Sequence, residues 1–326
     1  MAPCSLFVIN PIARGAPPLD VLRLASARLE AEGWQTEFVL TQRKGDAVGV
    51  AREASGSGCD VVIACGGDGT VNEVANGLAG SETALAVIRG GTANVWAKEV
   101  GIPRDPLAAV RLLKEGRRRR VDLGVVESAA GESRYFLLMA GIGVDGHVVG
   151  HVPEGLKRRF GAVAYVAYAL ADGARFRPQP VSLTIEGETA EVNLFWLVAG
   201  NTRSYGGLVN ITHHAVVDDG LLDMYAFTGG SVARKVGLWL RVLTHQQDSA
   251  PGIEYRRVRE VRLSTPSPLE GQVDGEVLGL APQVIRVVPR ALTVVVPKAK
   301  NELFGRLAGR HFSRLDGEDA GVRQGL

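Results

Sequence analysis

The sequence predicts two domains of different class, an N-terminal open α/β domain and a C-terminal antiparallel β-sandwich domain. In the first 120 residues, short β-branched runs alternate with segments of helical periodicity, which is typical of a parallel sheet covered by helices. After residue 120, short strands follow one another with few helices between them, which is typical of a sandwich. The 41 glycines and 15 prolines also favour many short elements joined by tight turns.

The first domain is expected to contain four strands and at least three helices. The predicted strands cover residues 5–9, 36–40, 60–64 and 84–88. Two helices are predicted by apolar residues spaced i, i+3, i+4 and i+7, namely Ala47, Val50, Ala51 and Ala54 in one and Val71, Val74, Ala75 and Leu78 in the other. A third helix should begin at Asp105 and Pro106, an N-cap followed by proline at the first helical position, and end before Gly116.

The second domain is expected to be built mainly from strands. They are predicted at residues 121–126, 135–140, 181–185, 192–198, 222–227, 258–263, 284–288 and 292–296, with helices at 159–171 and 231–243. We therefore divide the chain into an α/β domain at 1–120, a sandwich domain at 121–298 and a C-terminal segment at 299–326. That last segment should contain a helix near 301–308, packed back on the first domain, and a frayed tail.

Composition excludes several classes of protein. With 46% hydrophobic and 22% charged residues among 326, the chain is neither disordered nor fibrous. A net charge of +2 supplies no global field for nucleic acid. Cys4, Cys59 and Cys65 lack a CxxC spacing, and we see neither a signal peptide nor a bilayer-spanning stretch. These observations predict a cytoplasmic protein.

The most informative segment is the run Gly66 to Glu73, which follows an apolar strand and opens a helix. In a strand–glycine turn–helix arrangement, backbone N–H groups and the positive helix end converge on an anion. A glycine turn alone is equally typical of an ordinary tight turn. Asp68 changes this interpretation, because a carboxylate among phosphate-binding glycines would repel the ligand unless it holds Mg²⁺ or accepts a proton. The pattern therefore points to phosphoryl transfer.

Two further turns follow neighbouring strands, at residues 10–15 and 90–94. Ligands of open α/β sheets sit outside the carboxyl ends of the strands, so all three turns should converge on one crevice. Arg14 could contact a terminal phosphate there, and Thr41, just past the second strand, could hydrogen-bond the nucleotide.

Six ordered motifs carry a family resemblance. They are Asn10-Pro11, Gly66 to Glu73, Gly91 to Asn94, Gly141 to Asp145, Asp218 to Asp223 and Asp274 to Glu276. Together they resemble the diacylglycerol kinase catalytic family, in particular the bacterial YegS-like lipid kinases, over residues 5–297. The resemblance implies transfer of a phosphoryl group from ATP to a lipid hydroxyl, in a cleft between a nucleotide-binding domain and a sandwich domain, with Mg²⁺ as the metal.

The resemblance also implies a set of site residues. The nucleotide contacts would be Asn10, Pro11, Ile12, Ala13, Arg14, Thr41, Gly66, Gly67, Asp68, Gly69, Thr70, Val71, Asn72 and Thr92. The catalytic acidic position falls on Glu276 with Asp274 beside it, and Asp68 is a rival for the general base. A structural Mg²⁺ would be held by the Asp219 carboxylate and the carbonyls of Val216 and Leu221, a donor set that suits a hard cation.

Some alternatives stay open at the level of sequence. Asp274-Gly275-Glu276 is also typical of a plain hairpin turn. Val95 and Trp96 follow Asn94, where many relatives carry an acidic residue, so a contact through that carboxylate is in doubt. The alternatives to a lipid kinase are an NAD kinase, which also uses a GGDG turn, and a non-catalytic lipid-binding protein of the same fold.

The remaining basic and histidine-containing segments give weaker signals. The run 117–120 is either a solvated strand entry or a contact for lipid headgroups or phosphate. Segments 157–160 and 234–241 mix basic and apolar residues as interfacial helices do. His147 and His151 lack an evident third ligand, and His213-His214 suits Mg²⁺ poorly, so neither pair enters the predicted site. The expected partners are a lipid substrate and, peripherally, a membrane; a homodimer stays open.

Overall fold

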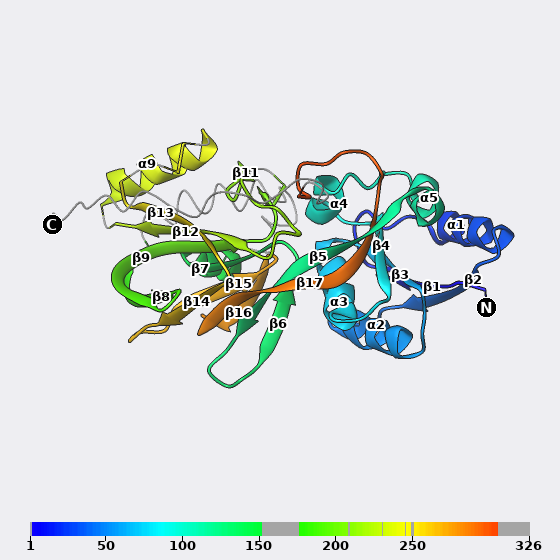
Figure 1. Cartoon of the computed structure of the whole chain (residues 1–326), viewed down its shortest axis with the longest axis horizontal. Coiled ribbons are helices and arrows are strands. Elements are labelled where there is room, and N and C mark those ends of the chain that lie inside the picture. The colour runs from blue at the N-terminus through cyan, green and yellow to red at the C-terminus, as the bar shows by residue number, and fades with distance from the viewer. Residues whose placement is uncertain are drawn as a thin grey trace, which may run out of the picture.

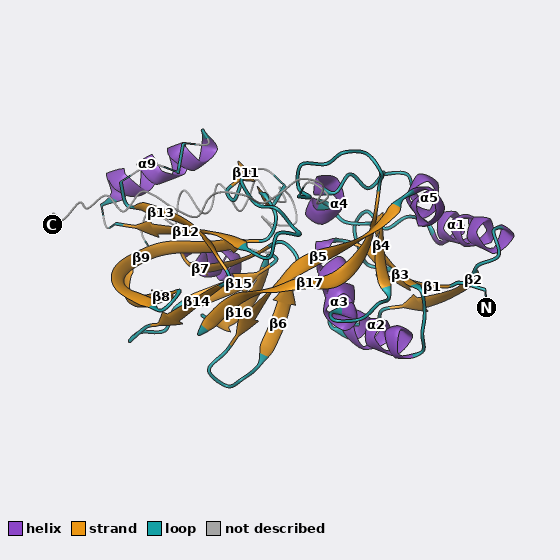
Figure 2. Cartoon of the chain, in the orientation of Figure 1, coloured by secondary structure: helices purple, strands orange, loops and turns teal. Residues whose placement is uncertain are grey.

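The computed structural model describes residues 2–151, 176–207, 209–229, 231–244, 246–248 and 251–305. It shows two lobes side by side along the long axis of the molecule (Figure 1), a helix-rich lobe at the N-terminal end and a strand-rich lobe beyond it. In Figure 2 the purple helices lie on both sides of the strands in the first lobe, whereas the second lobe is drawn almost entirely in orange strands. The predicted order of fold classes is confirmed.

The first lobe is a parallel sheet with strand order β4-β3-β1-β2. Its strands are β1 (Cys4–Ile9), β2 (Gln35–Leu40), β3 (Val61–Gly66) and β4 (Ala84–Arg89). The helices are α1 (Leu19–Ala31), α2 (Asp46–Gly56), α3 (Asp68–Leu78), α4 (Val95–Glu99) and α5 (Pro106–Glu115). α1 packs on α5, and α2 packs on α3. β3 is buried along its whole length because it is a central strand covered by helices.

The second lobe is an antiparallel assembly. Its strands are β6 (Ser133–Phe136), β7 (Met139–Gly143), β8 (Gln179–Ile185), β9 (Glu188–Gly200), β12 (Leu222–Thr228), β13 (Ile253–Val258), β14 (Glu260–Ser264), β15 (Glu270–Val273) and β16 (Glu276–Leu280), with a small separate pair β10 (Ser204–Tyr205) and β11 (Val209–Asn210). The described helices are α6 (Val144–His151) and α9 (Val232–Leu243). The long strand β9 pairs with β8 through its first half and with both β7 and β12 through its second.

Two long strands join the lobes into one continuous sheet. β17 (Val284–Val296) pairs with β14 near its start and with β4 near its end, while β5 (Arg117–Glu127) runs antiparallel to it in both lobes. The register shifts between Val288 and Leu292, where Arg290 has a φ of 52°. The buried Asp122 carboxylate holds this irregularity by accepting hydrogen bonds from the backbone N–H groups of Arg290 and Gly220, at 2.7 and 2.6 Å.

Several elements differ from the sequence prediction. Residues 284–296 form one strand instead of two, whereas 135–140 and 258–263 each divide between two strands. Helices α1, α4 and α6 and the hairpin β15–β16 were not predicted as elements. The predicted helix at 159–171 lies outside the described residues, as does the chain from 306 onward. No helix among the described residues is long and apolar enough to span a bilayer.

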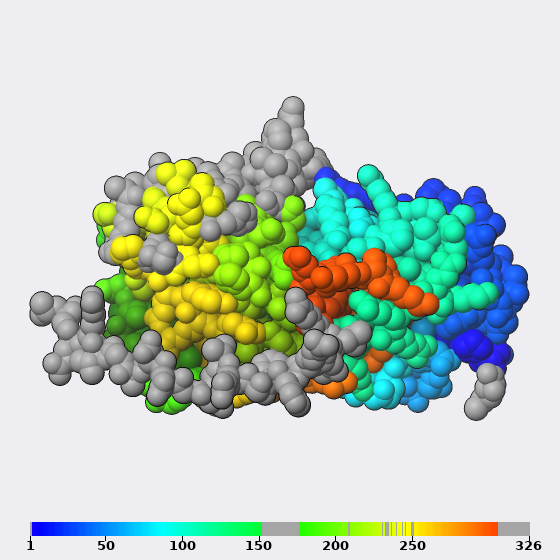
Figure 3. Space-filling view, turned by 45° about the horizontal axis from the view of Figure 1, so that its top comes forward, coloured from blue at the N-terminus to red at the C-terminus, as the bar shows by residue number. Residues whose placement is uncertain are grey.

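The segment after β17 returns to the junction between the lobes. Leu303 and Phe304 are buried, and the Asn301 side chain donates to the Glu99 carbonyl at the end of α4. In Figure 3 the orange-red residues at the end of the described chain lie between the cyan first lobe and the green second lobe. Residues 301–305 form turns, and the rest of the predicted C-terminal helix lies outside the described residues.

Candidate active site

Three turns at the carboxyl ends of β1, β3 and β4 meet at one edge of the first lobe. The Asn10 side chain donates to Thr70 Oγ1 at 3.2 Å, which joins the first turn to the start of α3. Gly15 N donates to the Gly90 carbonyl at 2.9 Å, and Gly90 N donates to the Gly66 carbonyl at 2.8 Å. Backbone and side-chain hydrogen bonds therefore link all three turns to one another.

The glycines of these turns are required by the close approach of two backbones. A Cβ added to Gly91 would lie 2.5 Å from Gly67 Cα, and one added to Gly90 would lie 2.9 Å from Gly66 Cα. Gly67 is also the N-cap of α3 and provides no side-chain hydrogen bond to the helix. The first N–H groups of α3 are therefore not capped by that residue, an arrangement suited to a phosphate.

Asp68 lies in the first turn of α3 and contacts the turn after β4. Its Oδ1 accepts a hydrogen bond from Trp96 N at 3.3 Å, at the start of α4. Burial raises the pKa of Asp68, and the N–H groups of Trp96, Val95 and Asn94 limit the rise. Asn94, at a φ of 47°, accepts from Gly91 N at 2.8 Å and so fixes the same turn. Asp68 thus orders the third turn.

The outer residues of the predicted nucleotide site are more exposed. Pro11, Ile12, Arg14 and Thr92 are exposed at the rim, and Ala13 is half-buried. Ile12 N donates to Asn10 Oδ1 at 3.2 Å, so the Asn10 side chain orders its own turn while it contacts Thr70. Within α3, Thr70, Val71 and Asn72 are buried.

Thr41 follows β2 directly. Its backbone N–H donates to the Ile9 carbonyl at 2.9 Å and its hydroxyl to the same oxygen at 3.3 Å. Thr41 is therefore joined to the end of β1, next to Asn10.

Glu276 reaches this region from the second lobe. Its Oε1 lies 3.5 Å from the position that a Cβ on Gly69 would occupy, so the carboxylate contacts the glycine turn directly. Its Oε2 is paired with Lys44 Nζ at 3.0 Å and with the Arg134 guanidinium. Burial acts to raise the pKa of Glu276, but the hydrogen bonds from Arg134 and Lys44 outweigh it and lower the pKa below its ordinary value. The carboxylate is thus ionised at neutral pH.

Asp274 occupies the turn of the β15–β16 hairpin and faces inward. Asp274 and Gly275 both have positive φ, at 49° and 80°, which is the geometry of a tight two-residue hairpin turn. The Asp274 carboxylate accepts from the backbone N–H groups of Leu137, Leu138 and Met139 at 2.9–3.0 Å, and from the Asn72 side chain. Burial raises its pKa to about 6, against the effect of these four donors.

The occupied oxygens of Asp274 favour a positioning role over a catalytic one. Both oxygens already accept hydrogen bonds from the β6–β7 connection and from α3. This anchorage fixes the hairpin that carries Glu276. The hairpin interpretation of Asp274-Gly275-Glu276 therefore describes the backbone, while its two carboxylates make contacts that a plain turn does not require.

Amide side chains strengthen the contact between the lobes. Asn76, four residues after Asn72 on α3, donates to the Tyr135 carbonyl at 3.0 Å and accepts from Tyr135 N at 3.0 Å. Behind the hairpin, Gln272 accepts from Gly275 N at 2.8 Å and donates to the buried Asp145 carboxylate at 2.8 Å. The motif ending in Asp145 therefore supports the turn that presents Glu276.

The predicted metal residues lie in another turn, which packs on β5. Asp219 Oδ1 accepts from Leu221 N at 3.0 Å, and Oδ2 is paired with the Arg257 guanidinium. Burial raises the pKa of Asp219 to about 6, and the nearby Asp223 and Asp122 carboxylates add to the rise while Arg257 opposes it. This group of three carboxylates fits a hard cation.

The remaining Asp219-turn residues are less informative. Val216 and Leu221 are half-buried beside Asp219. Asp219 contacts Leu221 and Arg257, which belong to the second lobe. The structure therefore does not bring this carboxylate to the three turns that follow β1, β3 and β4.

Two of the four consecutive arginines of β5 make structural contacts that the sequence did not indicate. Arg119 is paired with Asp218 and lies over the Phe304 ring at 4.9 Å, and Arg120 is paired with Glu82. Neither a fully solvated strand entry nor a headgroup-binding patch describes these two residues, because their guanidinium groups are used at the junction of the lobes.

Sequence reasoning missed Lys44, Arg134 and Asn76. Asn76 carried a usable signal, since it is four residues from Asn72 and so shares its helix face. Lys44 and Arg134 are isolated basic residues in ordinary surroundings, and only the fold brings them to Glu276. Glu270 was missed for the same reason, although it lies against both His147 and His151.

Comparison with known proteins gives matches over both lobes. Residues 5–126 match the family model of the diacylglycerol kinase catalytic domain, and residues 139–296 match that of the YegS C-terminal NAD kinase beta sandwich-like domain. A diacylglycerol kinase of Bacillus subtilis is 30% identical over 278 residues, covering 84% of this chain and 90% of its own length. A probable YegS-like lipid kinase of Chromohalobacter salexigens is 32% identical over 284 residues, covering 86% and 90%.

The fold is also shared with a solved structure. A crystal structure of a putative diacylglycerol kinase from Bacillus anthracis matches with a TM-score of 0.74, covering 91% of this chain and 98% of that one at 24% identity. The arrangement of the two lobes is therefore one already seen in a crystal.

Proposed function

Because this chain belongs to the family of diacylglycerol kinases and YegS-like lipid kinases, we propose that it transfers the γ-phosphoryl group of MgATP to the hydroxyl of a diacylglycerol-like lipid. The observation that carries this proposal is the contact of Glu276, from the second lobe, with the glycine turn of the first. A phosphate donor and a hydroxyl acceptor held on opposite sides of that contact would be aligned for transfer.

The nucleotide phosphates are proposed to lie over the uncapped start of α3 and the turns after β1 and β4. Bound Mg²⁺ would supply neutralisation of the phosphate charge, and Asp68 is the first-lobe carboxylate that we propose as its ligand. Asp219 would hold a second, structural Mg²⁺. Lys44 and Arg134 keep Glu276 ionised, so that it can orient the acceptor hydroxyl and take its proton.

A low pKa at Glu276 is compatible with this role. The transition state of phosphoryl transfer is loose, so little proton transfer is needed before the phosphoryl group has left the nucleotide. Positioning of the hydroxyl then matters more than the strength of the base.

The acceptor side carries an apolar cavity of about 480 Å³. It lies along β16, the strand that begins with Glu276, and its walls include Phe176, Leu269, Val277 and Leu280. Val277 and Leu280 are 47% and 68% exposed, and an acyl chain in the cavity would cover this apolar surface. These features support a lipid rather than a water-soluble acceptor such as NAD.

The activity is tested by offering γ-labelled ATP and Mg²⁺ to the purified chain with diacylglycerol in mixed micelles, with NAD, and with no acceptor. We expect label in the lipid fraction. The Glu276→Gln variant should lose about 10²–10⁴-fold in rate, because the carboxylate that both orients the hydroxyl and accepts its proton is gone. Glu254→Gln, which also removes an ion-paired glutamate of the second lobe, should leave the rate unchanged. Label in NAD instead, or no transfer to any acceptor, would reject the proposal.

Peripheral contact with a membrane is proposed for α9, at the outer end of the second lobe (Figure 1). Near the end of this helix Leu240 is 57% exposed and is followed by the exposed Arg241, a combination typical of interfacial helices. Lys235 of the same helix is buried and donates to the Phe176 carbonyl, so it does not take part. The basic segment 157–160 lies outside the described residues.

Sedimentation with anionic vesicles tests this contact. The wild-type chain should sediment with the vesicles, and Leu240→Glu should reduce the bound fraction several-fold. Leu24 on α1 is equally exposed, at 57%, but lies in the first lobe, so Leu24→Glu is the matched control and should bind like wild type. Equal loss in both variants, or no binding by wild type, would remove α9 as the contact.

A further inference from the structure

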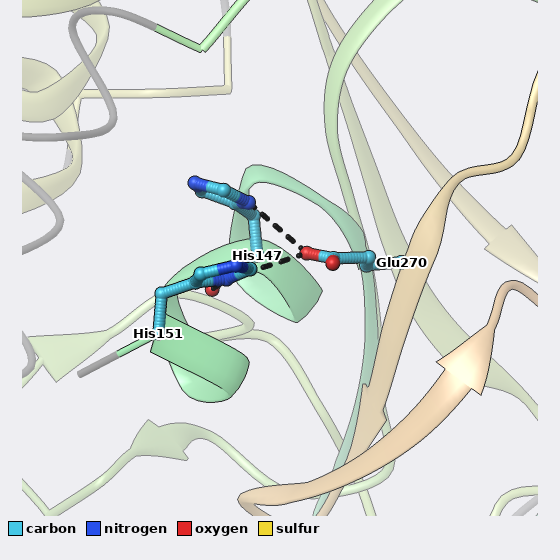
Figure 4. A group of neighbouring side chains, drawn as sticks. All are labelled: His147, His151 and Glu270. Atoms are coloured by element: carbon cyan, nitrogen blue, oxygen red, sulfur yellow. Dashed lines mark hydrogen bonds and ion pairs between the residues drawn. The ribbon is translucent and has the colours of Figure 1, made fainter. Parts of the chain in front are cut away.

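Two histidines of α6 and a glutamate of β15 form a compact cluster of metal-ligand groups. His147 and His151 project from successive turns of α6 toward Glu270, as Figure 4 shows. His147 Nδ1 lies 3.1 Å from Glu270 Oε2, and His151 Nδ1 lies 3.8 Å from the same oxygen. One candidate ligand atom from each residue lies within 4.8 Å of the other two.

The spacing of these atoms is close to that of a transition-metal site. With metal–ligand bonds of about 2.0–2.2 Å and tetrahedral angles, ligand atoms lie roughly 3.3–3.6 Å apart. The His147–Glu270 separation is already near this value. Two histidines at i and i+4 on one helix face are a recurrent zinc-binding pair. The His151 side chain is 50% exposed, so its ring can turn to bring Nε2 toward the other two ligand atoms.

Hydrogen bonding prepares His151 for metal binding. Its Nδ1 lies 2.9 Å from the His147 carbonyl, so a proton on Nδ1 donates to that oxygen. This tautomer leaves the lone pair on Nε2, and fixing the tautomer through the second nitrogen is the usual support for a metal-binding histidine.

A second cluster, formed by His213, His214 and Asp248, is better explained by hydrogen bonding alone. Asp248 also accepts from the Tyr225 hydroxyl, and His213 Nδ1 is within 3.0 Å of the Gln247 amide. Both groups are thus committed to a local network. In the described part of the chain, the Glu270 carboxylate contacts His147 and His151.

We propose that His147, His151 and Glu270 bind a zinc ion between α6 and the β15–β16 hairpin. Imidazole nitrogens select zinc over the magnesium used with the nucleotide. Three protein ligands leave a fourth position for water, and both His147 and Glu270 line the apolar cavity beside β16. The metal would thus tie a helix to the hairpin that carries Glu276. The inference rests on this geometry and does not depend on the kinase reaction.

The test is zinc titration of the untagged full-length chain by calorimetry, with zinc chloride as the probe. We expect one tight site. His151→Gln and Glu270→Gln should each weaken it by at least about 100-fold, because losing even an outer partner of a metal site costs about 10–100-fold. His214→Gln makes the same substitution in the other cluster and should leave the affinity unchanged. Circular dichroism of each metal-free variant confirms that the fold is retained.

Cobalt provides a second readout. Co²⁺ bound by two imidazoles and a carboxylate in a tetrahedral site absorbs in the visible range, and this absorption should be present in wild type and His214→Gln but absent in Glu270→Gln. Zinc affinity that is unaffected by His151→Gln, or lost in His214→Gln, would overturn the assignment, as would the lack of a tight site in wild type.

Discussion

The Glu276 carboxylate lies between two cations and a glycine, and this placement determines its chemistry. Its pKa is lowered because Arg134 and Lys44 favour the ionised form more than burial opposes it. The pairing is also structural, since Lys44 belongs to the first lobe and Glu276 to the second. The pKa of Glu276 therefore depends on how the two lobes are placed, because Lys44 lowers it only while the lobes hold the two side chains together.

Replacing Lys44 tests the ionisation of Glu276. In Lys44→Met the pKa of Glu276 rises, because one of the two cations that favour the carboxylate is gone. If the ionised form is the active one, the acidic limb of the kcat/KM–pH profile moves to higher pH, while the rate at the plateau is kept. Lys114→Met removes a surface lysine paired with Glu32 and should leave the profile unmoved. An acidic limb that stays in place in Lys44→Met would argue that another group, with Asp68 the first candidate, is the base.

Asp274 provides a test based on stability. Burial raises the pKa of Asp274 in the folded protein to about 6, from an ordinary value near 3.8. Between pH 4 and pH 6, roughly, the folded protein therefore keeps a proton on Asp274 that the unfolded chain has lost. The contribution of Asp274 to the free energy of unfolding therefore falls as the pH rises from about 4 to about 6. Urea unfolding of wild type and Asp274→Asn should show a stability difference, wild type minus variant, that falls over this range.

The opposite slope would have a clear meaning. A stability difference that increases with pH would indicate that the three backbone donors and Asn72 outweigh burial and hold the carboxylate in its ionised form. The experiment thus separates the two effects that compete at this residue.

At this scale, part of the site could be predicted from the sequence and part could not. The glycine turns and Asp68 follow a recognisable strand, so local pattern is enough to place them. Lys44, Arg134 and Glu270 have no local pattern, because their roles arise from residues more than 100 positions away in the chain. The His147–His151 pair was visible, but its third ligand was not.

At the scale of elements, the turns after β3 and β4 pack as two bare backbones. Gly91→Ala would place a methyl group 2.5 Å from Gly67 Cα, so one turn must move. We expect a loss of roughly 1–3 kcal/mol in the free energy of unfolding, typical of overpacking, and weaker nucleotide binding. Gly49→Ala is the matched control. Gly49 lies in α2 with nothing within 4 Å of an added Cβ, so alanine should stabilise by about 0.5–1 kcal/mol.

Chemical denaturation and nucleotide titration of both variants measure these effects. Equal stability changes in Gly91→Ala and Gly49→Ala would contradict the steric argument. Intact stability with lost nucleotide binding would instead place the whole effect on the site.

The predicted elements are determined by sequence patterns within the element, whereas the missed ones are too short for a pattern, have an interrupted pattern, or depend on tertiary contacts. The faces of α2 and α3 follow apolar spacing, and Asp105 caps α5 as predicted, through hydrogen bonds to Leu107 N and Ala108 N. α4 has only five residues, too few for a periodic pattern. β15 and β16 contain Gly271 and Gly279. They pair with each other, and β15 also pairs with β7, a tertiary contact. α1 carries a buried serine within its apolar face, which obscured its periodicity.

At the scale of the whole molecule, β5 and β17 belong to both lobes. The predicted boundary at residue 120 falls inside β5, because the change in sequence rhythm occurs there while the strand itself continues. Each lobe depends on the same pair of strands, so we expect the lobes to unfold together. Circular dichroism and tryptophan fluorescence should report coincident denaturation curves. Two separated transitions would show that the shared strands do not couple the lobes.

Asp122 is the residue on which this coupling should depend most. Asp122→Ala leaves the half-buried N–H groups of Gly220 and Arg290 without their charged acceptor, at about 1.5–3 kcal/mol for each hydrogen bond to a charged group. The loss of stability should appear in both probes equally. Asp105→Ala is the comparison, since Asp105 also accepts from two backbone N–H groups but at an exposed helix cap, and it should cost only about 0.5–2 kcal/mol.

The position of β17 has a consequence for how the protein matures in the cell. β4 receives its second neighbour only from residues near 293, roughly 200 positions after its own sequence. During translation the first lobe must therefore wait with an unprotected strand edge until nearly the whole polypeptide has left the ribosome. Chaperones that shield nascent chains should associate with this protein over most of its synthesis, and a gene shortened before codon 284 should yield insoluble product.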